Sequence, residues 1–422
     1  MPMASEWVMR NDYLDKLKAF EGKDLIKVVT GLRRCGKSTL LMLYRSELLK
    51  QGVPEDHILL FNFELMELDE IRDYKVFYHF VKDRLPENGR TWLLLDEIQQ
   101  VAQWERAVNS LRIEADVDIC VTGSNAHLLS SEIATLLSGR YVEIKMLPLS
   151  FREYISFHHL PDSWTNEERF NQYLRFGGLP AVTALPQDES IIQDFLQGVF
   201  NTVIVKDIVD RSKLRDVTLL NRILRYVIGN TGSIVSANRI SGFLSSQDKG
   251  ESIRPASVSA TLDVLEQAYV LYQVQRYDIR GKETLKTLSK YYVVDTGFRN
   301  ILIGHTDRDF GHVLETVVFF ELLRRGYQVF IGKWFDKEVD FLAIRQDDKR
   351  YYQVTASVLD EGVRTRELAP LVAIQDNYVK IILSMDTTWF TDHEGIRFQN
   401  IIEFLLEGDY AKSSTFLEQT ET

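Results

Sequence analysis

The chain has 422 residues, enough for two or three domains that each bury a core. Its net charge of −11 excludes a protein coated in basic surface, and its two cysteines, Cys35 and Cys120, cannot form a disulfide framework. No apolar run reaches the ~18 residues of a membrane span, and the charged amino-terminal segment lacks the apolar centre of a signal peptide. We therefore expect a cytoplasmic protein without a membrane segment.

Five apolar runs lie within residues 1–150, at 24–29, 57–63, 91–97, 117–123 and 141–147. They have too few polar residues to alternate, as expected for strands buried on both faces of a sheet. Helical patterns separate them, such as residues 37–52, which Gly52 and Pro54 end. This βαβ order predicts an α/β fold in which helices cover both faces of a parallel sheet.

The pattern changes beyond this first unit. Residues 151–210 are helical in pattern, with a break at FGGLP (176–180), and residues 211–300 continue with short helices. Strand candidates follow at 268–277 and 290–295. For residues 301–410 we expect an α/β unit with a helix over 312–326 and strands at 327–334, 338–344 and 351–357. The polar residues 411–422 are expected to fray.

The stretch GLRRCGKS (31–38) joins the first strand to the first helix and fits the pattern G-x-x-x-x-G-K-[ST]. Gly31 and Gly36 allow backbone N–H groups to turn inward around phosphate oxygens, and the following helix directs its positive end to the same place. Lys37 is expected to reach the β- and γ-phosphates and Ser38 to bind Mg²⁺. The sequence thus predicts Mg-ATP binding over Gly31–Thr39.

Three other residues of this loop permit two interpretations each. Arg33 and Arg34 either touch the nucleotide or are solvated, and we include Arg34 among the candidate nucleotide ligands. Cys35 either makes the loop sensitive to oxidation or is a spacer.

The apolar run WLLL ends in Asp96 and Glu97. Downstream of a P-loop, an aspartate at a strand end is expected to hold Mg²⁺ through its water shell. Glu97 is expected to orient and deprotonate the attacking water, because hydrolysis needs a base in line with the γ-phosphate. The alternative is a strand that ends in two solvated carboxylates.

Polar residues also follow the next two strands. Ser124 and Asn125, after the run VDICVTG, are expected either to sense the γ-phosphate or to cap the following helix. Arg140, before the fifth strand, is either a surface residue or an arginine that stabilises the transition state within or between subunits.

Together these motifs resemble the AAA+-like branch of the P-loop ATPases. The stretch TGSNAHLLSSEIATLLSGRYVEIKMLPLSFREY and the later FGGLPAV resemble one widespread group of prokaryotic ATPases. That group joins its ATPase domain to a carboxy-terminal domain of unknown function whose core resembles restriction endonucleases. The resemblance implies ATP binding and spans nearly the whole chain, but it implies no cellular role.

Residues 206–290 carry 14 Lys and Arg against 9 Asp and Glu, which leaves −16 for the rest of the chain. The order of helices and strands here resembles a winged helix, with residues 254–268 as the recognition-helix candidate. Arg254, Ser257 and Ser259 would then approach DNA phosphates or a groove. The alternative is a small lid or protein-contact domain, and Asp263 and Glu266 on the same helix weaken the electrostatic argument for DNA.

The carboxy-terminal series resembles the PD-(D/E)xK nuclease core. Glu315 and Asp340 match its first two acids, but the third acid and the lysine would fall at Gln353 and Thr355. An amide binds Mg²⁺ weakly and a threonine supplies no cation, so we expect no cleavage. Glu315 and Asp340 would then be remnants paired with Lys or Arg, and Lys380 is a candidate to fill the gap from a neighbouring strand.

Three functions are compatible with these sequence patterns. The first is an ATPase that acts as a molecular switch on nucleic acid or on a protein partner, as a monomer or a homo-oligomer. The second is a DNA-binding regulator or scaffold that uses ATP as a ligand. The third, which we disfavour, is a metal-dependent nuclease.

Overall fold

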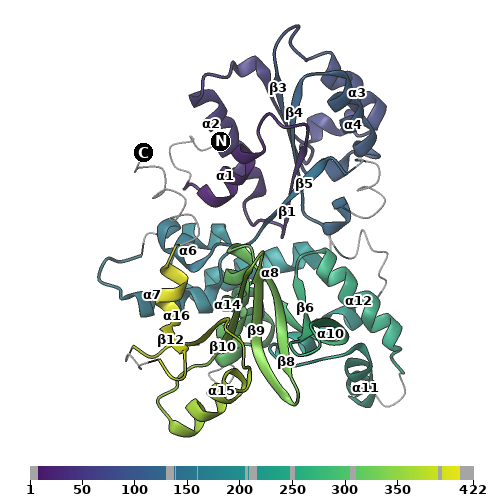
Figure 1. Cartoon of the computed structure of the whole chain (residues 1–422). Coiled ribbons are helices and arrows are strands. Elements are labelled where there is room, and N and C mark those ends of the chain that lie inside the picture. Colours follow the sequence, from purple (N-terminus) through teal and green to yellow (C-terminus); the bar gives the residue numbers. More distant parts are fainter. Residues whose placement is uncertain are drawn as a thin grey trace, which may run out of the picture.

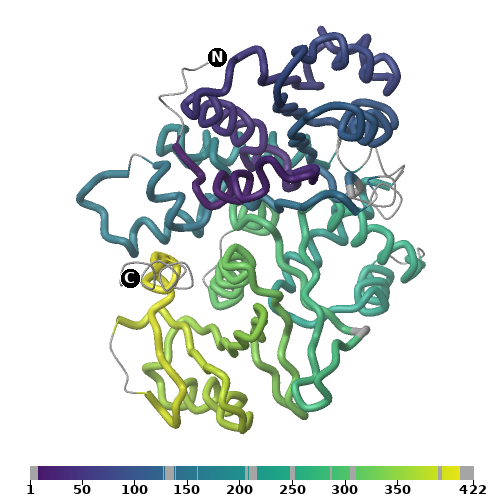
Figure 2. Tube along the Cα trace, turned by 45° about the horizontal axis from the view of Figure 1, so that its top comes forward, coloured from purple at the N-terminus to yellow at the C-terminus, as the bar shows by residue number. Residues whose placement is uncertain are grey.

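The computed structural model describes residues 8–129, 137, 139–158, 160–204, 208, 216–247, 252–304, 310–387 and 392–408 (Figure 1). The tail that we expected to fray, 411–422, and parts of the basic segment 206–290 lie outside the described residues. In Figures 1 and 2 the amino-terminal part, coloured purple to blue, lies above the carboxy-terminal part, coloured green to yellow.

The amino-terminal part is built on a five-stranded parallel sheet with the strand order β2-β3-β4-β1-β5. Its strands are β1 (Ile26–Gly31), β2 (Ile58–Asn62), β3 (Thr91–Asp96), β4 (Val117–Gly123) and β5 (Tyr141–Met146). Its helices are α1 (Asn11–Ala19), α2 (Lys37–Lys50), α3 (Tyr74–Lys82) and α4 (Trp104–Glu114). The short 3₁₀ helices are η2 (Glu55–His57), η3 (Met66–Ile71), η4 (Ile98–Gln100) and η5 (Ala126–Leu129).

Successive residues of a strand point to opposite faces of this sheet, so both faces bury apolar side chains. Val29 packs in one core with Leu41 and Tyr44 of α2, whereas Val28 packs in the other with Trp104 and Val108 of α4. The βαβ prediction is therefore confirmed. Because all five strands run parallel, their carboxyl ends meet at one edge, where the loops that follow β1, β3 and β4 come together.

A helical layer follows the first sheet and lies between the two parts in Figure 1. It contains α6 (Phe151–Phe157), α7 (Asn166–Phe176), η6 (Pro180–Ala184) and α8 (Glu189–Thr202). Reciprocal capping boxes, Ser150 with Glu153 and Thr165 with Glu168, set the starts of α6 and α7. Gly177 ends α7 with φ +79°, as the break at FGGLP predicts.

The remaining helices are α10 (Val217–Gly229), α11 (Ala237–Gln247), α12 (Pro255–Gln267), α13 (Thr296–Ile303), α14 (Phe310–Arg324), α15 (Glu361–Ala373) and α16 (Ile401–Leu406). The remaining strands are β6 (Leu271–Asp278), β7 (Glu283–Val293), β8 (Gln328–Trp334), β9 (Lys337–Arg345), β10 (Asp348–Val354), β11 (Val379–Ser384) and β12 (Ile396–Asn400). They form one mixed sheet with the order β12-β11-β10-β9-β8-β6-β7.

This second sheet crosses the boundary that we expected between residues 211–300 and 301–410. The β6–β7 hairpin follows the recognition-helix candidate of the segment that resembles a winged helix, and it pairs with β8 through Arg276–Ile331 and its neighbours. The hairpin is thus an extension of the carboxy-terminal sheet. The unpaired N–H and C=O groups on the edge of a strand gain hydrogen bonds when that strand joins a sheet. No helix within the described ranges has both the length and the hydrophobicity to cross a membrane.

Candidate nucleotide-binding site

The P-loop lies where β1 ends and α2 begins. Gly31 has φ +148°, and a Cβ atom there would come within 2.1 Å of the carbonyl oxygen of Met146 on β5. Gly36 caps α2 with φ +106°, which a residue with a side chain rarely adopts. Both glycines are therefore required by the backbone itself.

The Lys37 side chain folds back into this loop. Its Nζ donates hydrogen bonds to the carbonyl oxygens of Gly31 at 3.0 Å and Leu32 at 3.1 Å, and only 4% of the residue is exposed. The amino group is thus held at the start of α2, where the partial positive charge of the helix also favours an anion. Ser38 and Thr39, the next two residues of the helix, are exposed to solvent beside it.

Asp96 and Glu97 face this loop from the end of β3. Asp96 accepts hydrogen bonds from Thr122 at 2.6 Å and from Ser38. Burial raises the pKa of Asp96, while these hydrogen bonds act in the opposite direction. The pairing of Ser38 with Asp96 brings a hydroxyl and a carboxylate together, and oxygen donors of this kind suit Mg²⁺.

Glu97 has a left-handed backbone with φ +54°, which turns its side chain toward Lys37. The Glu97 Oε1 atom lies 3.8 Å from Lys37 Nζ, and Glu97 Oε2 accepts hydrogen bonds from Gln99 and, at 3.3 Å, from Ser124. The Glu97 N–H donates to the Thr122 hydroxyl at 2.9 Å. A conformation this unusual for glutamate is retained where its surroundings enforce it, as here.

The polar residues after β4 complete the constellation. Ser124 is fully buried and bonds Glu97, and Asn125 next to it is also buried. The structure therefore brings Lys37, Ser38, Asp96, Glu97 and Ser124 to one edge of the sheet. Such a set can place a cation and a base beside a phosphate chain.

The other loop residues lie farther from this constellation. Arg33 pairs with Glu64 at 2.9 Å, and the exposed Arg34 guanidinium lies 5.9 Å from the ring centroid of Phe195 on α8. Cys35 is fully buried, its thiol directed at the Met146 carbonyl oxygen, and burial raises the pKa of the thiol. A buried thiol with a raised pKa is poorly reactive, so the structure favours the spacer interpretation.

Arg140 is not brought to this site. It precedes β5, whose first residue, Tyr141, pairs with Ile26 at the start of β1, whereas the P-loop follows the end of β1. Five residues of strand separate the two ends, which is roughly 17 Å. Arg140 is exposed and pairs with Asp24 at 2.6 Å. An action of Arg140 on the P-loop of its own chain is therefore excluded in this arrangement, and an action on a neighbouring subunit stays a prediction.

A second polar cluster lies in the carboxy-terminal sheet. Lys290 of β7 is buried, and its Nζ lies 2.8 Å from Glu338, 3.6 Å from Glu315 and 3.9 Å from Asp340. Burial would raise the pKa of Glu315, but Lys290 and His312 hold it below its usual value. Burial and the charge of Glu315 raise the pKa of Asp340. The two acids are thus paired with a lysine, as we expected from the sequence.

Gln353 and Thr355 occupy the positions where a nuclease core would carry its third acid and its lysine, whereas a different lysine, Lys290 of β7, reaches Glu315 and Asp340. Gln353 accepts a hydrogen bond from the Asp340 backbone and donates one to Glu367 at 2.8 Å, and Thr355 lies at the end of β10. Lys380 bonds the carbonyl oxygens of Ile374 and Asp376 instead of filling the gap. No group of three or more His, Cys, Asp or Glu side chains in the described ranges can hold a metal ion. The resemblance of this domain to nucleases therefore has no support.

Three residues that make polar contacts with the groups described above or with the loop region were not identified from the sequence. Thr122 links Asp96 to Glu97, and a lone polar residue near the end of an apolar strand was the only signal for it. Lys290, and Arg10, which bonds Glu153 at 2.8 Å, carry no local signal, because each meets partners that are far away in the sequence.

Two protein families match parts of the chain. The AAA domain matches residues 23–155, and a domain of unknown function (DUF8612) matches residues 167–309. The second match covers the middle of the chain, whereas our resemblance placed the uncharacterised domain at the carboxy terminus.

Relatives cover most of the chain. An uncharacterized protein of Haemophilus influenzae is 39% identical over 408 residues, which is 96% of this chain and 100% of that protein. An uncharacterized protein of Methanocaldococcus jannaschii is 29% identical over 360 residues, which is 81% of this chain and 77% of that protein. Among solved structures, the Walker-type ATPase of Pyrococcus abyssi is similar with a TM-score of 0.50 and 16% identity, over 71% of this chain and 97% of that one.

The sheet, the P-loop and the AAA match define a protein with the fold of an AAA-type P-loop ATPase. The chain belongs to one family with the Haemophilus influenzae protein, and in this chain the AAA domain forms the amino-terminal part.

Proposed function

We propose that the protein binds Mg-ATP at the P-loop and hydrolyses it to ADP and phosphate. The observation that carries this proposal is the convergence of Lys37, Asp96 and Glu97 at the start of α2. Lys37 would exchange its loop carbonyls for the β- and γ-phosphates, and Asp96 with Ser38 would hold Mg²⁺. Glu97, 3.8 Å from Lys37, would then face the γ-phosphate and activate water.

Isothermal titration of the full chain with Mg-ATP tests this assignment. Replacement of Lys37 by alanine removes a charge-assisted phosphate contact, so affinity falls at least about tenfold. Lys50→Ala is the matched control, because Lys50 ends the same helix and pairs with Glu47 at the surface. Equal affinity in the Lys37 and Lys50 variants would refute nucleotide binding at this loop.

The proposed consequence of turnover is a molecular switch. The helical layer, the α10–α12 unit and the carboxy-terminal sheet all follow the ATPase part in the chain and pack against it. Hydrolysis would therefore change how they present a surface to a nucleic acid or a protein partner, in a monomer or a homo-oligomer.

A second candidate function is DNA binding through α12. Helices α10, α11 and α12 pack together before the β6–β7 hairpin, and Val235 pairs with Ser289 of that hairpin. Arg254, Ser257 and Ser259 are exposed, whereas Val258 and Leu262 are buried, so α12 presents a polar face. Phosphate contacts would be made from this face.

Duplex DNA binding as a function of salt tests the second candidate. Arg254→Glu should weaken binding and reduce its salt dependence, while Arg84→Glu, the same charge change on the ATPase part, should not. Identical behaviour of the two variants would refute a DNA surface on α12.

A further inference from the structure

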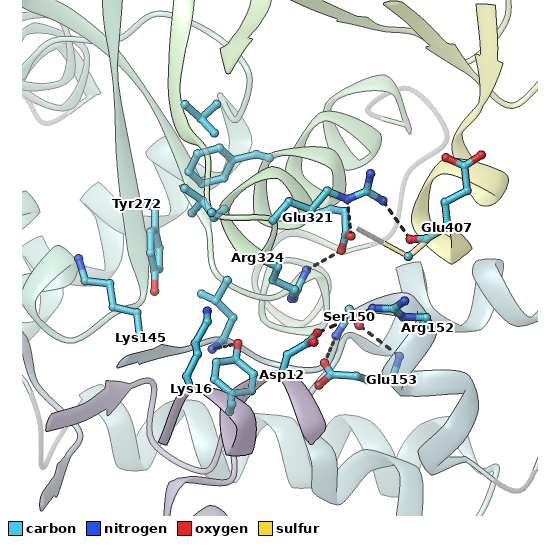
Figure 3. A pocket seen from close by; sticks show the side chains of 18 of the residues that line it. Asp12, Lys16, Lys145, Ser150, Arg152, Glu153, Tyr272, Glu321, Arg324 and Glu407 are labelled. Carbon is cyan, nitrogen blue, oxygen red and sulfur yellow. Dashed lines mark hydrogen bonds and ion pairs between the residues drawn. The ribbon is translucent and has the colours of Figure 1, made fainter. Parts of the chain in front are cut away.

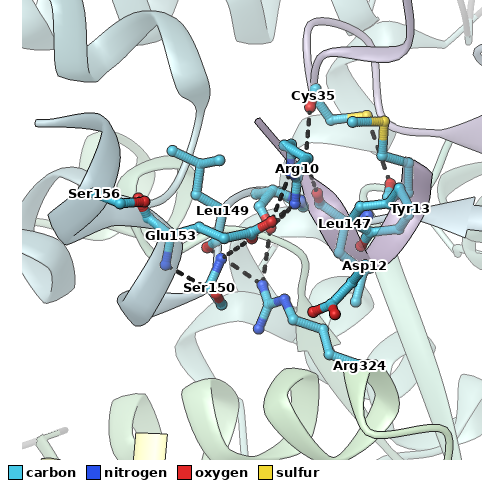
Figure 4. Close-up of polar contacts among 12 residues, drawn as sticks. Arg10, Asp12, Tyr13, Cys35, Leu147, Leu149, Ser150, Glu153, Ser156 and Arg324 are labelled. Carbon is cyan, nitrogen blue, oxygen red and sulfur yellow. Dashed lines mark hydrogen bonds and ion pairs between the residues drawn. The ribbon is translucent and has the colours of Figure 1, made fainter. Parts of the chain in front are cut away.

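Arg10 lies in a buried junction between the P-loop and the turn after β5 (Figure 4). Its Nε and Nη2 bond the two carboxylate oxygens of Glu153 at 2.8 and 2.9 Å. Its Nη1 donates to the carbonyl oxygens of Cys35 at 3.1 Å and Leu147 at 3.0 Å, and its Nη2 also reaches Pro148 O at 3.5 Å. These five contacts use every N–H group that a guanidinium has.

The contact with Cys35 matters because Cys35 belongs to the P-loop. A loop that turns N–H groups inward around phosphate must turn carbonyl groups outward, and a buried carbonyl needs a donor. Arg10 is that donor for Cys35, and the Tyr13 ring, 4.6 Å from the Arg10 guanidinium, supports it from α1. Arg10 thereby fixes the outer side of the loop whose inner side faces the nucleotide.

A second arginine reaches the same turn from the carboxy-terminal part. Arg324, in the last turn of α14, donates from Nη2 to Pro148 O at 2.9 Å and Leu149 O at 3.3 Å. Arg10 and Arg324 therefore both contact the Pro148 carbonyl oxygen. Figure 4 shows the two arginines on opposite sides of the segment that contains Leu147 and Leu149. The chain of contacts runs from Cys35 through Arg10 and Pro148 to α14.

A cavity of about 610 Å³ borders this link (Figure 3). Its lining includes Glu153 of α6, Tyr272 of β6, and Glu321 and Arg324 of α14. The last turn of α14 thus borders open space on this side, whereas residues 313–322 of the helix are buried in the core.

We propose that Arg10 is a positioning residue of the P-loop and that Arg324 couples the loop to α14 through the carbonyl groups of residues 147–149. The proposal rests on the proposed ATP binding. A phosphate that moves the Cys35 peptide shifts Arg10, the turn and then α14. By reciprocity, the position of α14 changes the affinity for nucleotide.

Nucleotide affinity of the full chain, measured by titration with Mg-ATP, tests the coupling. Arg324→Gln should weaken binding about threefold to tenfold, since a charge-assisted hydrogen bond to the turn is lost. Arg325→Gln is the matched control. Arg325 is the adjacent residue and also pairs with Glu321, but it reaches Phe404 and Glu407 instead of the turn. Equal affinities for the two variants would overturn the proposal.

Hydrogen exchange of residues 310–324 provides a second measurement. The change in exchange on addition of ATP does not arise from a loss of stability alone. ATP should change exchange in this helix in the wild type and in Arg325→Gln, but not in Arg324→Gln. An ATP response that persists in Arg324→Gln would also overturn the proposal.

Arg10 is tested in the same titration. Arg10→Gln should weaken binding about tenfold. Arg10→Lys keeps a charge but has three donors, so its affinity should lie between those of Arg10→Gln and the wild type. In the Arg10→Gln, Arg324→Gln double variant the two effects should not add, because they act through one turn, and additive effects would contradict the link.

Other results would show that the proposed function, and not the coupling, is wrong. If the wild type and Lys37→Ala both fail to bind ATP, nucleotide binding itself is wrong. If the Arg10 variants do not fold, Arg324→Gln against Arg325→Gln still decides the coupling.

Discussion

Lys37 and Glu97 face each other at the candidate nucleotide site, with 3.8 Å between Nζ and Oε1. Both side chains are buried, so the charge of each is partly balanced by the other. A γ-phosphate that draws Lys37 away from Glu97 would release the carboxylate to bond water. Under the proposed function, the same pair would provide the cation for the substrate and the base for the reaction.

Replacement of Glu97 by glutamine separates these two tasks. The amide keeps the shape and the contacts with Gln99 and Ser124 but cannot accept a proton. We expect phosphate release to fall about 100-fold to 10,000-fold while ATP affinity is retained. Phosphate release with and without duplex DNA, beside an ATP titration, measures both. Gln100→Glu, a charge change on the neighbouring η4, is the control, and undiminished turnover in Glu97→Gln would exclude Glu97 as the base.

The position of Arg140 leads to a prediction about assembly. Because it lies at the opposite end of β5 from its own P-loop, its action on ATP requires a second subunit. Arg140→Ala should therefore bind ATP normally but lose turnover, and mixing it with Glu97→Gln should restore part of the activity. Arg90→Ala, which removes a half-buried arginine that pairs with Asp116 beside the start of β3, should leave turnover unchanged. If Arg140→Ala turns over ATP at the wild-type rate, Arg140 is a surface residue that pairs with Asp24.

Local sequence patterns were sufficient to predict the first sheet and the group of residues around the P-loop. Apolar runs with little alternation identify strands buried on both faces, and a parallel sheet brings the residues after β1, β3 and β4 to one edge. The strand order of the second sheet could not be predicted in this way. The parallel pairing of β6 with β8 joins residues about 55 apart in the sequence, and no periodic pattern of apolar residues indicates it. Lys290 and the placement of Arg140 depend on strand pairings of this kind. Arg10 instead meets Glu153 through a hydrogen bond between residues 143 apart.

Lys290 should be needed for the stability of the carboxy-terminal sheet. Its Nζ balances Glu315, Glu338 and Asp340, all within 3.9 Å, in a buried setting. Lys290→Met leaves buried carboxylates without a countercharge, so we expect a loss of about 3–5 kcal/mol in the free energy of unfolding. Denaturant titration measures it.

The exposed Lys337→Met on β9 is the control for Lys290 and should change stability little. A loss below about 1 kcal/mol in Lys290→Met would mean that the acids are neutral without the lysine.

Divalent-metal-dependent DNA cleavage that Asp340→Ala abolishes would instead restore the nuclease interpretation.

Asp295 should make the junction of the helical layer with α13 dependent on pH. Burial raises the pKa of Asp295 to about 6, although its carboxylate accepts hydrogen bonds from the N–H groups of Gly178 at 2.7 Å and Gly297 at 2.9 Å. A carboxyl whose pKa is higher in the folded state binds its proton more tightly there. Its stabilising effect is therefore complete below about pH 3.8 and is lost as the pH rises through about 6.

The comparison of wild type with Asp295→Asn isolates this effect, because asparagine does not titrate. The free energy of unfolding of the wild type, relative to the variant, should decrease between about pH 4 and pH 6, by on the order of 3 kcal/mol. It should then stay constant to pH 8. Asn201→Ala, at an exposed position of α8 without a titrating side chain, should run parallel to the wild type over the same range. Parallel curves for Asp295→Asn as well would mean that Asp295 stays ionised, held by its backbone N–H donors against the cost of burial.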